Sequence, residues 1–417
     1  MQKILIIGTV WPEPRSTAAG SRMLQIIEQF QNQLFDVVFA CSAAKGEFSF
    51  DLESIAVATV AIELNNANFD DFILKLNPSI VVFDRFMSEE QFGWRVAENL
   101  PNCLRILDTE DLHFVRKTRI ECFNIKKSVE INDYLNAELA QREIASIFRC
   151  DLSLIISEVE MEILTSIFKI DSRILLYVPF LLDNISQYDL DSFPSFAERK
   201  HFITIGNFRH EPNWNSVLYL KETIWPMIKK QLPDAELHIY GSYVTQKAMN
   251  LNNVKEGFLV KGRAENAHDV IKKAKVLLAP IRFGAGIKGK LTDAMICGTP
   301  SVTTIEGAES MVENTSSSLL SNWNGEIVNN AIDFANAAVA LYLKEKSWST
   351  AQKNGINIVN NRFDKTYFGK QLMDTILQTK NNLKYHRTHN FIGQMLQMQT
   401  LKSTKYMSKW IEEKNRL

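Results

Sequence analysis

The sequence predicts an α/β protein built from two doubly wound, Rossmann-like domains in tandem. Its 417 residues exceed what a single hydrophobic core usually organises. Apolar strand candidates alternate with amphipathic helices twice along the chain, and a polar segment without sustained periodicity separates the two alternations. We therefore expect an N-terminal domain over residues 1–183, a linker over 184–200, a second domain over 201–365 and C-terminal helices over 366–417.

The first alternation contains short apolar runs that favour parallel strands. They are KILIIG (3–8), DVVFAC (36–41), IVVFD (80–84), LRILD (104–108), LSLIIS (152–157) and ILLYVP (174–179). A helix is expected from about Ser21 to Gln33, with Ser21 as its N-cap. A long helical span rich in Lys, Glu and Arg, from about Leu112 to Arg149, is expected to flank a ligand cleft.

The second alternation repeats this pattern after the linker. Its strand candidates are FITIG (202–206), ELHIYG (236–241), VKEGFLV (254–260), VLLAP (276–280) and SVTT (301–304), with a helix from about Trp214 to Lys230. Open α/β sheets bind ligands beyond the carboxyl ends of their strands. The sequence therefore predicts a ligand site in the crevice between the two domains.

One glycine-rich stretch, PIRFGAGIKGKLTDAMICGTPSV (280–302), predicts what that ligand is. Gly284 and Gly286 permit a close approach to the backbone, and the helix that follows offers unpaired N–H groups to an anion. Lys290 and Asp293 share a helix face, which places a cation for a diphosphate beside a carboxylate for ribose hydroxyls. The stretch predicts a nucleotide-diphosphate site; the alternative is an ordinary strand–turn–helix with a solvated lysine and aspartate.

Three stretches together resemble the retaining glycosyltransferases of family 4, which have the GT-B fold. They are residues 280–302, residues 202–242 (FITIGNFRHEPNWNSV and onward) and residues 106–119 (ILDTEDLHFVRKTR). The resemblance implies transfer of a sugar from a nucleotide-diphosphate sugar to a hydroxyl acceptor, with retention of configuration. It also implies a donor site in the second domain, an acceptor side in the N-terminal domain and C-terminal helices that cross back onto the N-terminal domain.

The resemblance assigns the cations of the donor site. Arg209 and Lys290 are expected to bind the diphosphate as a pair, and Lys288 and Arg282 are weaker candidates. No DxD motif occurs in a suitable loop, because the DLD at 189–191 lies in the linker. We therefore predict no essential metal and no cofactor apart from the nucleotide-sugar donor.

One position departs from the family pattern. Many members carry two glutamates eight positions apart; here the second position is Asp293 and the first falls on Ala285. The ribose contact survives, but the sugar-contacting carboxylate is missing, so the backbone from Gly284 through Ala285 to Gly286 would hold the sugar. Glu309, and below it Glu306, offer carboxylates near the same crevice.

Two further candidates lie in the N-terminal domain. Gly20, in STAAGSR, resembles the glycine loop whose helix N-terminus faces the diphosphate or the acceptor. His113, after the strand LRILD, is expected near the donor sugar as a hydrogen-bond donor or charge sensor, with an ordinary loop histidine as the alternative. Asp84, Arg85 and Asp108 stand at strand ends, where side chains often face ligands.

Composition excludes some classes of protein. A formal net charge of −1 with 23% charged residues does not indicate a protein that coats nucleic acid. The five cysteines are odd in number and lack CxxC spacing, so we expect buried free thiols in a cytoplasmic protein.

The C-terminal segment 384–417 supports two interpretations. It carries seven Lys/Arg against two Glu, interleaved with Phe391, Met395, Met398, Tyr406, Met407 and Trp410. A basic amphipathic helix of this kind could lie on an anionic membrane surface near a lipid-linked acceptor. The favoured alternative is a tail helix that packs its methionines and aromatic rings on the body of the protein.

The sequence thus favours a retaining glycosyltransferase that acts on a glycan or lipid-linked acceptor during assembly of a polysaccharide, glycolipid or surface glycan. A catalytically silent GT-B scaffold remains an alternative because of Ala285. A nucleotide-sugar epimerase is a further alternative, which the low histidine content of seven disfavours.

Overall fold

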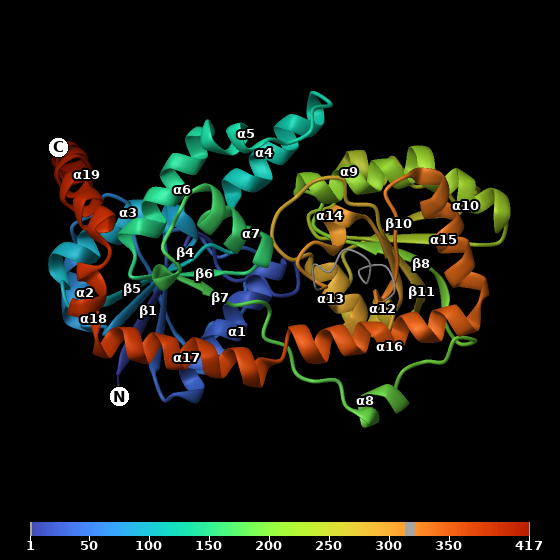
Figure 1. The fold of residues 1–417 in the computed structure, drawn as a ribbon, viewed down its shortest axis with the longest axis horizontal. Helices are drawn as coiled ribbons and strands as arrows, with labels where there is room; N and C mark the ends of the chain where they lie inside the picture. The colour runs from blue at the N-terminus through green and yellow to red at the C-terminus, as the bar shows by residue number, and fades with distance from the viewer. Residues whose placement is uncertain (1, 313–321, 417) are drawn as a thin grey trace.

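The computed structural model describes residues 2–312 and 322–416 and contains two parallel β-sheets side by side (Figure 1). The first sheet has the order β3-β2-β1-β4-β5-β6-β7 and the second β10-β9-β8-β11-β12-β13. The strands of the first sheet are β1 Lys3–Gly8, β2 Asp36–Cys41, β3 Ala58–Ala61, β4 Ile80–Asp84, β5 Leu104–Asp108, β6 Leu152–Ile155 and β7 Leu175–Tyr177. Those of the second are β8 Lys200–Ile205, β9 Leu237–Tyr240, β10 Phe258–Gly262, β11 Ala274–Ala279, β12 Ser301–Thr303 and β13 Gly325–Ile327.

The predicted α/β architecture of two doubly wound domains is confirmed. Every strand predicted from an apolar run is present, because a parallel strand covered by helices on both faces needs apolar side chains on both. Two strands were not predicted, β3 and β13. Both are short strands at a sheet edge with mostly half-exposed residues. β13 has no long apolar run, whereas β3 lies within the apolar run of residues 55–62, which was not assigned as a strand.

Helices cover both sheets. In the first domain they are α1 Ala18–Asn32, α2 Asn68–Leu76, α3 Arg85–Asn99, α4 His113–Asn124, α5 Ile131–Leu135, α6 Glu138–Arg149 and α7 Glu158–Glu162. A short α8 Gln187–Asp191 lies in the connection. The second domain has α9 Glu211–Tyr219, α10 Trp225–Gln231, α11 Gln246–Met249, α12 Ala267–Lys273, α13 Gly289–Ile296, α14 Ile305–Ala308, α15 Ala331–Leu343 and α16 Glu345–Arg362. The chain ends with α17 Lys365–Asn381, α18 Leu383–Thr388 and α19 Phe391–Arg416.

Two helix predictions need correction. The span 112–149 is three helices, because the chain turns out of the helical conformation after α4, with Lys126 at φ +55°. The first helix begins earlier than predicted: Thr17, not Ser21, is its N-cap and accepts a hydrogen bond from the Gly20 N–H at 3.0 Å. Ser21 instead donates its hydroxyl to the Pro14 carbonyl.

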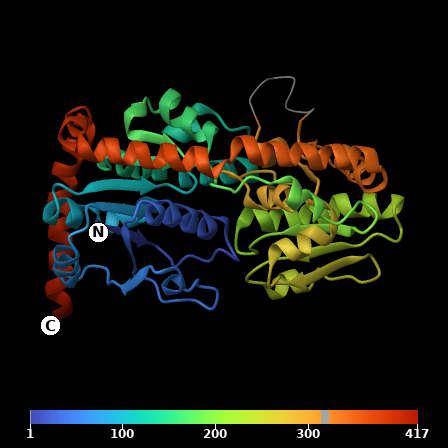
Figure 2. The ribbon, with the colours of Figure 1, turned by 90° about the horizontal axis from the view of Figure 1, so that it is seen from below.

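The C-terminal helices return to the first domain. Figure 2 shows α16 and α17 in orange and red, running along one side of both domains. Leu182 lies where the chain leaves the first domain, and it donates its N–H to the Phe363 carbonyl and accepts from the Lys365 N–H. The segment that leaves the first domain and the segment that returns to it therefore lie side by side. Leu372 and Ile376 of α17 then enter the core of the first domain. None of the helices over the described ranges is long and apolar enough to cross a lipid bilayer.

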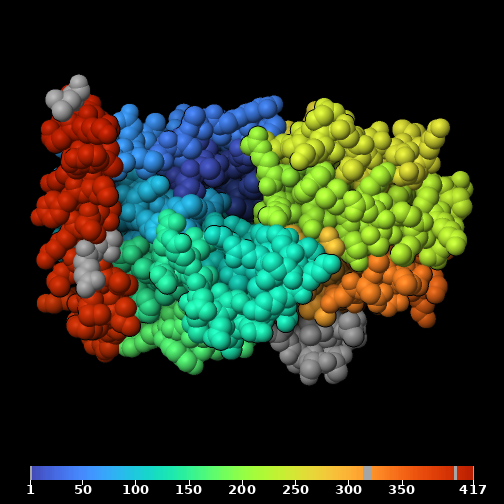
Figure 3. Space-filling model, turned by 90° about the horizontal axis from the view of Figure 1, so that it is seen from above, coloured from blue at the N-terminus to red at the C-terminus, as the bar shows by residue number. Residues whose placement is uncertain are grey.

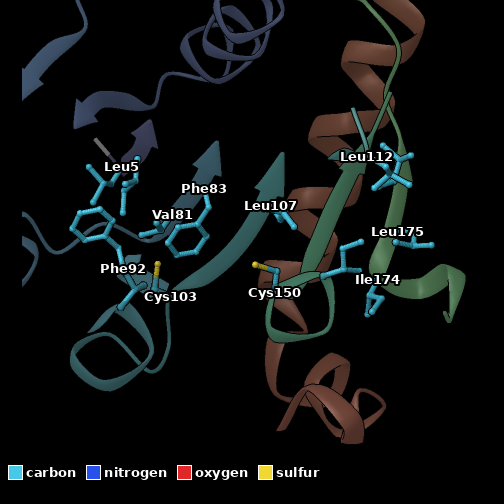
Figure 4. Close-up of a cluster of buried hydrophobic side chains, with 14 of the residues drawn as sticks. Leu5, Val81, Phe83, Phe92, Cys103, Leu107, Leu112, Cys150, Ile174 and Leu175 are labelled. Atoms are coloured by element: carbon cyan, nitrogen blue, oxygen red, sulfur yellow. The ribbon is translucent and has the colours of Figure 1, made fainter. Parts of the chain in front are cut away.

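The core beneath the first sheet holds two of the cysteines. Figure 4 shows Cys103 and Cys150 among Phe83, Leu107 and other apolar side chains. All five cysteines are buried and free, as predicted. Each thiol acts as a small apolar group in the core, a role that does not require two cysteines to lie close together in the sequence.

Candidate active site

A cavity of about 850 Å³ lies between the carboxyl ends of the two sheets. In Figure 3 a hollow is visible between the dark-blue N-terminal segment and the green start of the second domain. Three segments supply much of the lining: the start of α1, the loop from β5 to α4, and the loop from β11 to α13. The crevice predicted from the alternation of strands and helices is therefore a real cavity, with residues from both domains in its wall.

Lys290 lies in the wall of the cavity at the start of α13. Its Nζ donates to the Asn213 side-chain oxygen at 2.8 Å. Burial lowers the pKa of Lys290 to about 8, and among the described residues no carboxylate pairs with it. A half-buried cation held by a neutral amide favours an incoming anion.

The N-termini of two helices meet next to this lysine. A Cβ added to Gly289, the first residue of α13, would lie 2.7 Å from the Cβ of Ala18, the first residue of α1. Both helices direct unpaired N–H groups and the positive end of their dipoles towards the cavity. Together with Lys290 they form a site suited to a diphosphate.

The glycine loop at 284–286 also lines the cavity and packs against the first domain. Gly286 has φ +62°, and a Cβ there would lie 2.9 Å from the Cβ of Asp111. Ala285 packs on the apolar core of the first domain. The side chain of Glu160 in α7 accepts from the N–H groups of both Gly286 and Leu112 at 3.0 Å, which joins the loop to the other domain.

Lys288 and Glu309 are engaged in a bridge between the domains. Arg119 of α4 donates to Glu309 at 2.6 and 2.8 Å and to the Gly284 carbonyl at 2.8 Å. Lys288 donates to the Gly286 carbonyl and lies 3.7 Å from Glu309. Burial would raise the pKa of Glu309, but Lys288 and Arg119 lower it. Glu309 does not line the cavity, so its position favours a structural role over a ligand contact.

Asp293 lines the cavity one helical turn beyond Lys290. Its carboxylate lies 3.3 Å from the Nε2 of His268, and this hydrogen bond raises the pKa of His268. His268 comes from α12, whose sequence carries no motif, so sequence reasoning missed it. The pair offers one acceptor and one donor to the hydroxyl groups of a ribose.

The opposite wall, from the first domain, carries both signs of charge, with Glu110 and Asp111 beside Arg15, Arg85 and Arg116. His113 begins α4, with its Nδ1 3.1 Å from the Asp111 carbonyl oxygen, and lines the cavity as predicted. Among the described residues, one carboxylate oxygen on each of Asp84, Asp108 and Glu110 is buried without a hydrogen-bond partner. Burial, together with Asp108, raises the pKa of Glu110, whose backbone is held at φ +60°. Of these three residues Glu110 lines the cavity, and its unpartnered oxygen is suited to bind a hydroxyl group.

Besides Glu309, two predicted site residues, Arg209 and Gly20, lie outside the cavity lining. Arg209 is exposed, with its guanidinium 4.2 Å from the centre of the Tyr243 ring. Gly20 packs within α1, where an added Cβ would lie 2.5 Å from the backbone of Glu13. The predicted ligand roles of both residues stay predictions. The next residue, His210, does line the cavity, and desolvation by the cleft walls together with Arg116 lowers its pKa to about 4.

One cluster of described residues has side chains spaced to hold a metal ion, and it lies away from the cavity. Over the described parts of the chain, His201, Glu236 and His238 are the one cluster with suitable spacing. They stand at the start of β8 and β9, whereas the cavity lies at the opposite ends of these strands.

Glu160→Gln should make the stability of the protein less dependent on pH. Burial, and next the Asp111 carboxylate, raise the pKa of Glu160 to about 8, so the folded state retains a proton that the unfolded chain loses near pH 4.5. The free energy of unfolding should therefore fall as the pH rises from about 4.5 to about 8. Glutamine keeps the acceptor for Leu112 and Gly286 but does not titrate. Thermal unfolding of both proteins across this range tests the idea; parallel pH profiles would contradict it.

Comparisons with known proteins agree with this architecture. Residues 199–344 match the model of the family described as Glycosyl transferases group 1. No curated protein sequence matches the chain significantly.

Several solved structures share the fold. Sucrose-phosphate synthase from Thermosynechococcus elongatus is 15% identical, with a TM-score of 0.66 over 91% of this chain and 99% of its own. Anabaena HepE in complex with UDP-glucose is 14% identical, with a TM-score of 0.61 over 91% of this chain and all of its own. A complex of S. aureus TarM with Fondaparinux, alpha-GlcNAc-glycerol and UDP is 11% identical, with a TM-score of 0.67 over 90% and 100% of the two chains. At these identities the likeness establishes the fold.

Proposed function

We propose that this chain, which has the GT-B fold and matches the Glycosyl transferases group 1 model over residues 199–344, is a glycosyltransferase that transfers a sugar from a nucleoside-diphosphate sugar to a glycan hydroxyl with retention of configuration. The predicted fold is confirmed, and the comparisons support the predicted enzyme class. Membership of family 4, retention, and a role in polysaccharide, glycolipid or surface-glycan assembly stay predictions, as does the cytoplasmic location.

The main observation behind the proposal is the half-buried Lys290 beside the N-termini of α1 and α13. Transfer requires the bond between the anomeric carbon and the diphosphate oxygen to break, and the diphosphate leaves with extra negative charge. Fixed donors aimed at that charge commonly supply the largest catalytic effect. We propose that Lys290 and the N–H groups of α1 and α13 supply it in place of a metal ion.

The two walls of the cavity suggest how the substrates are arranged. Asp293 and His268 would bind the ribose of the donor. The unpartnered carboxyl oxygen of Glu110, which lines the cavity, would bind a hydroxyl group of the sugar acceptor. The acceptor hydroxyl would bond to the anomeric carbon on the face that the diphosphate leaves. Its proton would pass to a diphosphate oxygen, so no protein nucleophile is required.

Donor binding and turnover test this function directly. The purified chain should be heated with UDP, GDP, ADP, CDP and their sugars, with and without EDTA, because a ligand of the native state raises the unfolding temperature. We expect one nucleotide class to bind regardless of EDTA, and slow hydrolysis of its sugar to release the retained anomer. Binding that is abolished by EDTA would refute the metal-free site, and release of the inverted anomer would refute retention.

Asp293→Ala should weaken nucleotide binding about tenfold or more, since a charge-assisted hydrogen bond to a ribose hydroxyl contributes roughly 1.5–3 kcal/mol. Titration calorimetry with the preferred nucleoside diphosphate measures the loss. Asp234→Ala, which removes an exposed carboxylate of the same domain away from the cavity, is the matched control. Equal weakening in both variants would contradict the assignment.

A further inference from the structure

The last helix, α19, attaches to the first domain through a polar seam. It stands along the edge of that domain, shown in red in Figure 3, and contacts α3 and α6. Gln397 donates to the Arg149 carbonyl at 2.7 Å, and Ser408 donates to the Asn65 side chain at 2.9 Å. Glu412 pairs with Arg95, and Lys405 pairs with Glu98. Polar and charged contacts therefore hold much of this helix in place.

The apolar side chains of α19 face outward. The expectation that its methionines and aromatic rings pack on the body is wrong, because those side chains are between 45% and 69% exposed. We define this outward face by seven residues: Phe391, Ile392, Met395, Met398, Tyr406, Met407 and Trp410. With a helical period of 3.6 residues, most of them project away from the seam. So large an exposed apolar face on one helix indicates a binding surface.

The charges beside the outward face are positive. Lys402 and Lys409 are exposed, and neither forms an ion pair with any residue in the described ranges. The ammonium group of Lys414 lies 5.3 Å from the centre of the Trp410 ring. Both acidic residues on the helix form ion pairs, Glu412 with Arg95 and Glu413 with Arg416. The outward face therefore combines apolar side chains with unneutralised lysines.

We propose that the outward face of α19 binds the surface of an anionic lipid bilayer, with the helix lying in the interface. Aromatic and methionine side chains would enter the boundary between headgroups and acyl chains, and the lysines would contact anionic headgroups. A helix of 26 residues is about 39 Å long, which gives an extended contact without crossing the bilayer. A second copy of the chain is a poorer partner, because a twofold contact would bring the same lysines together.

This site is separate from the proposed glycosyltransferase site. None of the residues of the outward face lines the cavity. Hydrolysis of a soluble donor should therefore be unchanged by substitutions there, and failure of one proposal would leave the other standing.

Flotation of the full-length protein with lipid vesicles tests the proposal. We expect flotation with mixed phosphatidylcholine–phosphatidylglycerol vesicles, none with pure phosphatidylcholine, and weaker binding as salt is added. Two double variants, Tyr406→Glu/Trp410→Glu and Lys402→Glu/Lys409→Glu, should each bind the mixed vesicles at least about tenfold more weakly. Because these side chains are exposed, the unfolding temperature of each variant should stay unchanged.

Matched control variants introduce the same kinds of substitution at exposed residues of the second domain. Ile332→Glu adds a charge at a side chain that is 64% exposed. Lys346→Glu/Lys353→Glu repeats the charge reversal on exposed lysines of α16. Both controls should bind the vesicles like the unmodified chain. Three outcomes would overturn the proposal: no flotation with anionic vesicles, undiminished binding by the α19 variants, or a lipid-free dimer in sedimentation velocity that the α19 variants abolish.

Discussion

Lys290→Ala should reduce kcat/KM for sugar transfer by about two to three orders of magnitude, the usual effect of losing one preorganised donor at a developing negative charge. Its Nζ faces the cavity with a single described hydrogen bond, to Asn213, and no carboxylate partner in the described residues. No other described lysine of the glycine loop can replace it, since Lys288 is held by the Gly286 carbonyl and Glu309. Initial rates with the preferred donor measure the loss. Activity within a few fold of the unmodified enzyme would place the diphosphate elsewhere.

The same substitution should not weaken the fold, which separates this result from simple unfolding. Burial lowers the pKa of Lys290 to about 8 from 10.5, so the folded state disfavours the charge that the unfolded chain carries. Its contribution to stability is therefore most unfavourable below pH 8 and disappears above the unfolded pKa. Lys290→Met should unfold at a higher temperature than the unmodified protein at neutral pH while losing activity. Lys346→Ala, an exposed lysine of α16, should change neither property.

The sequence was most informative where a site is continuous in the chain. Gly284, Lys290 and Asp293 lie within one strand–turn–helix, so their spacing alone indicated a shared surface, and the structure places all three at one cavity. Contacts between distant segments could not be predicted in this way. Arg119 and Glu309 are 190 positions apart, and Glu160 and Gly286 are 126 apart, with no local pattern that links them.

The C-terminal helix shows a different limit of sequence reasoning. Its apolar periodicity correctly indicated an amphipathic helix, but periodicity does not say which face meets the protein. Here the seam consists of residues such as Gln397, Ser408 and Glu412, whose partners Arg149, Asn65 and Arg95 belong to distant segments. Because such partners appear only in the folded chain, the usual assumption that the apolar face is the packed face fails.

Arg22→Leu should lower the stability of the first domain by about 3–5 kcal/mol, the usual cost of removing one partner of a buried ion pair. Arg22 is 1% exposed and Asp108 0% exposed. The Arg22 guanidinium donates to Asp108 at 3.0 and 3.1 Å and to the Val178 and Pro179 carbonyls at 2.6 and 3.2 Å. It thus joins α1, the end of β5 and the chain leaving β7. Urea unfolding followed by circular dichroism measures the change.

A matched variant and a double variant identify the cause of that loss. Arg173→Leu removes an exposed arginine of the same domain that pairs with Asp171, and should leave the unfolding midpoint almost unchanged. The double variant Arg22→Leu/Asp108→Leu leaves no buried aspartate charge without a partner. It should therefore be more stable than Arg22→Leu alone. If the double variant were instead as unstable as the sum of the two single variants, the lost packing and carbonyl contacts would account for the effect. Arg22 also holds α1, whose N-terminus forms one wall of the cavity, so its removal should weaken nucleotide binding more than its effect on stability predicts.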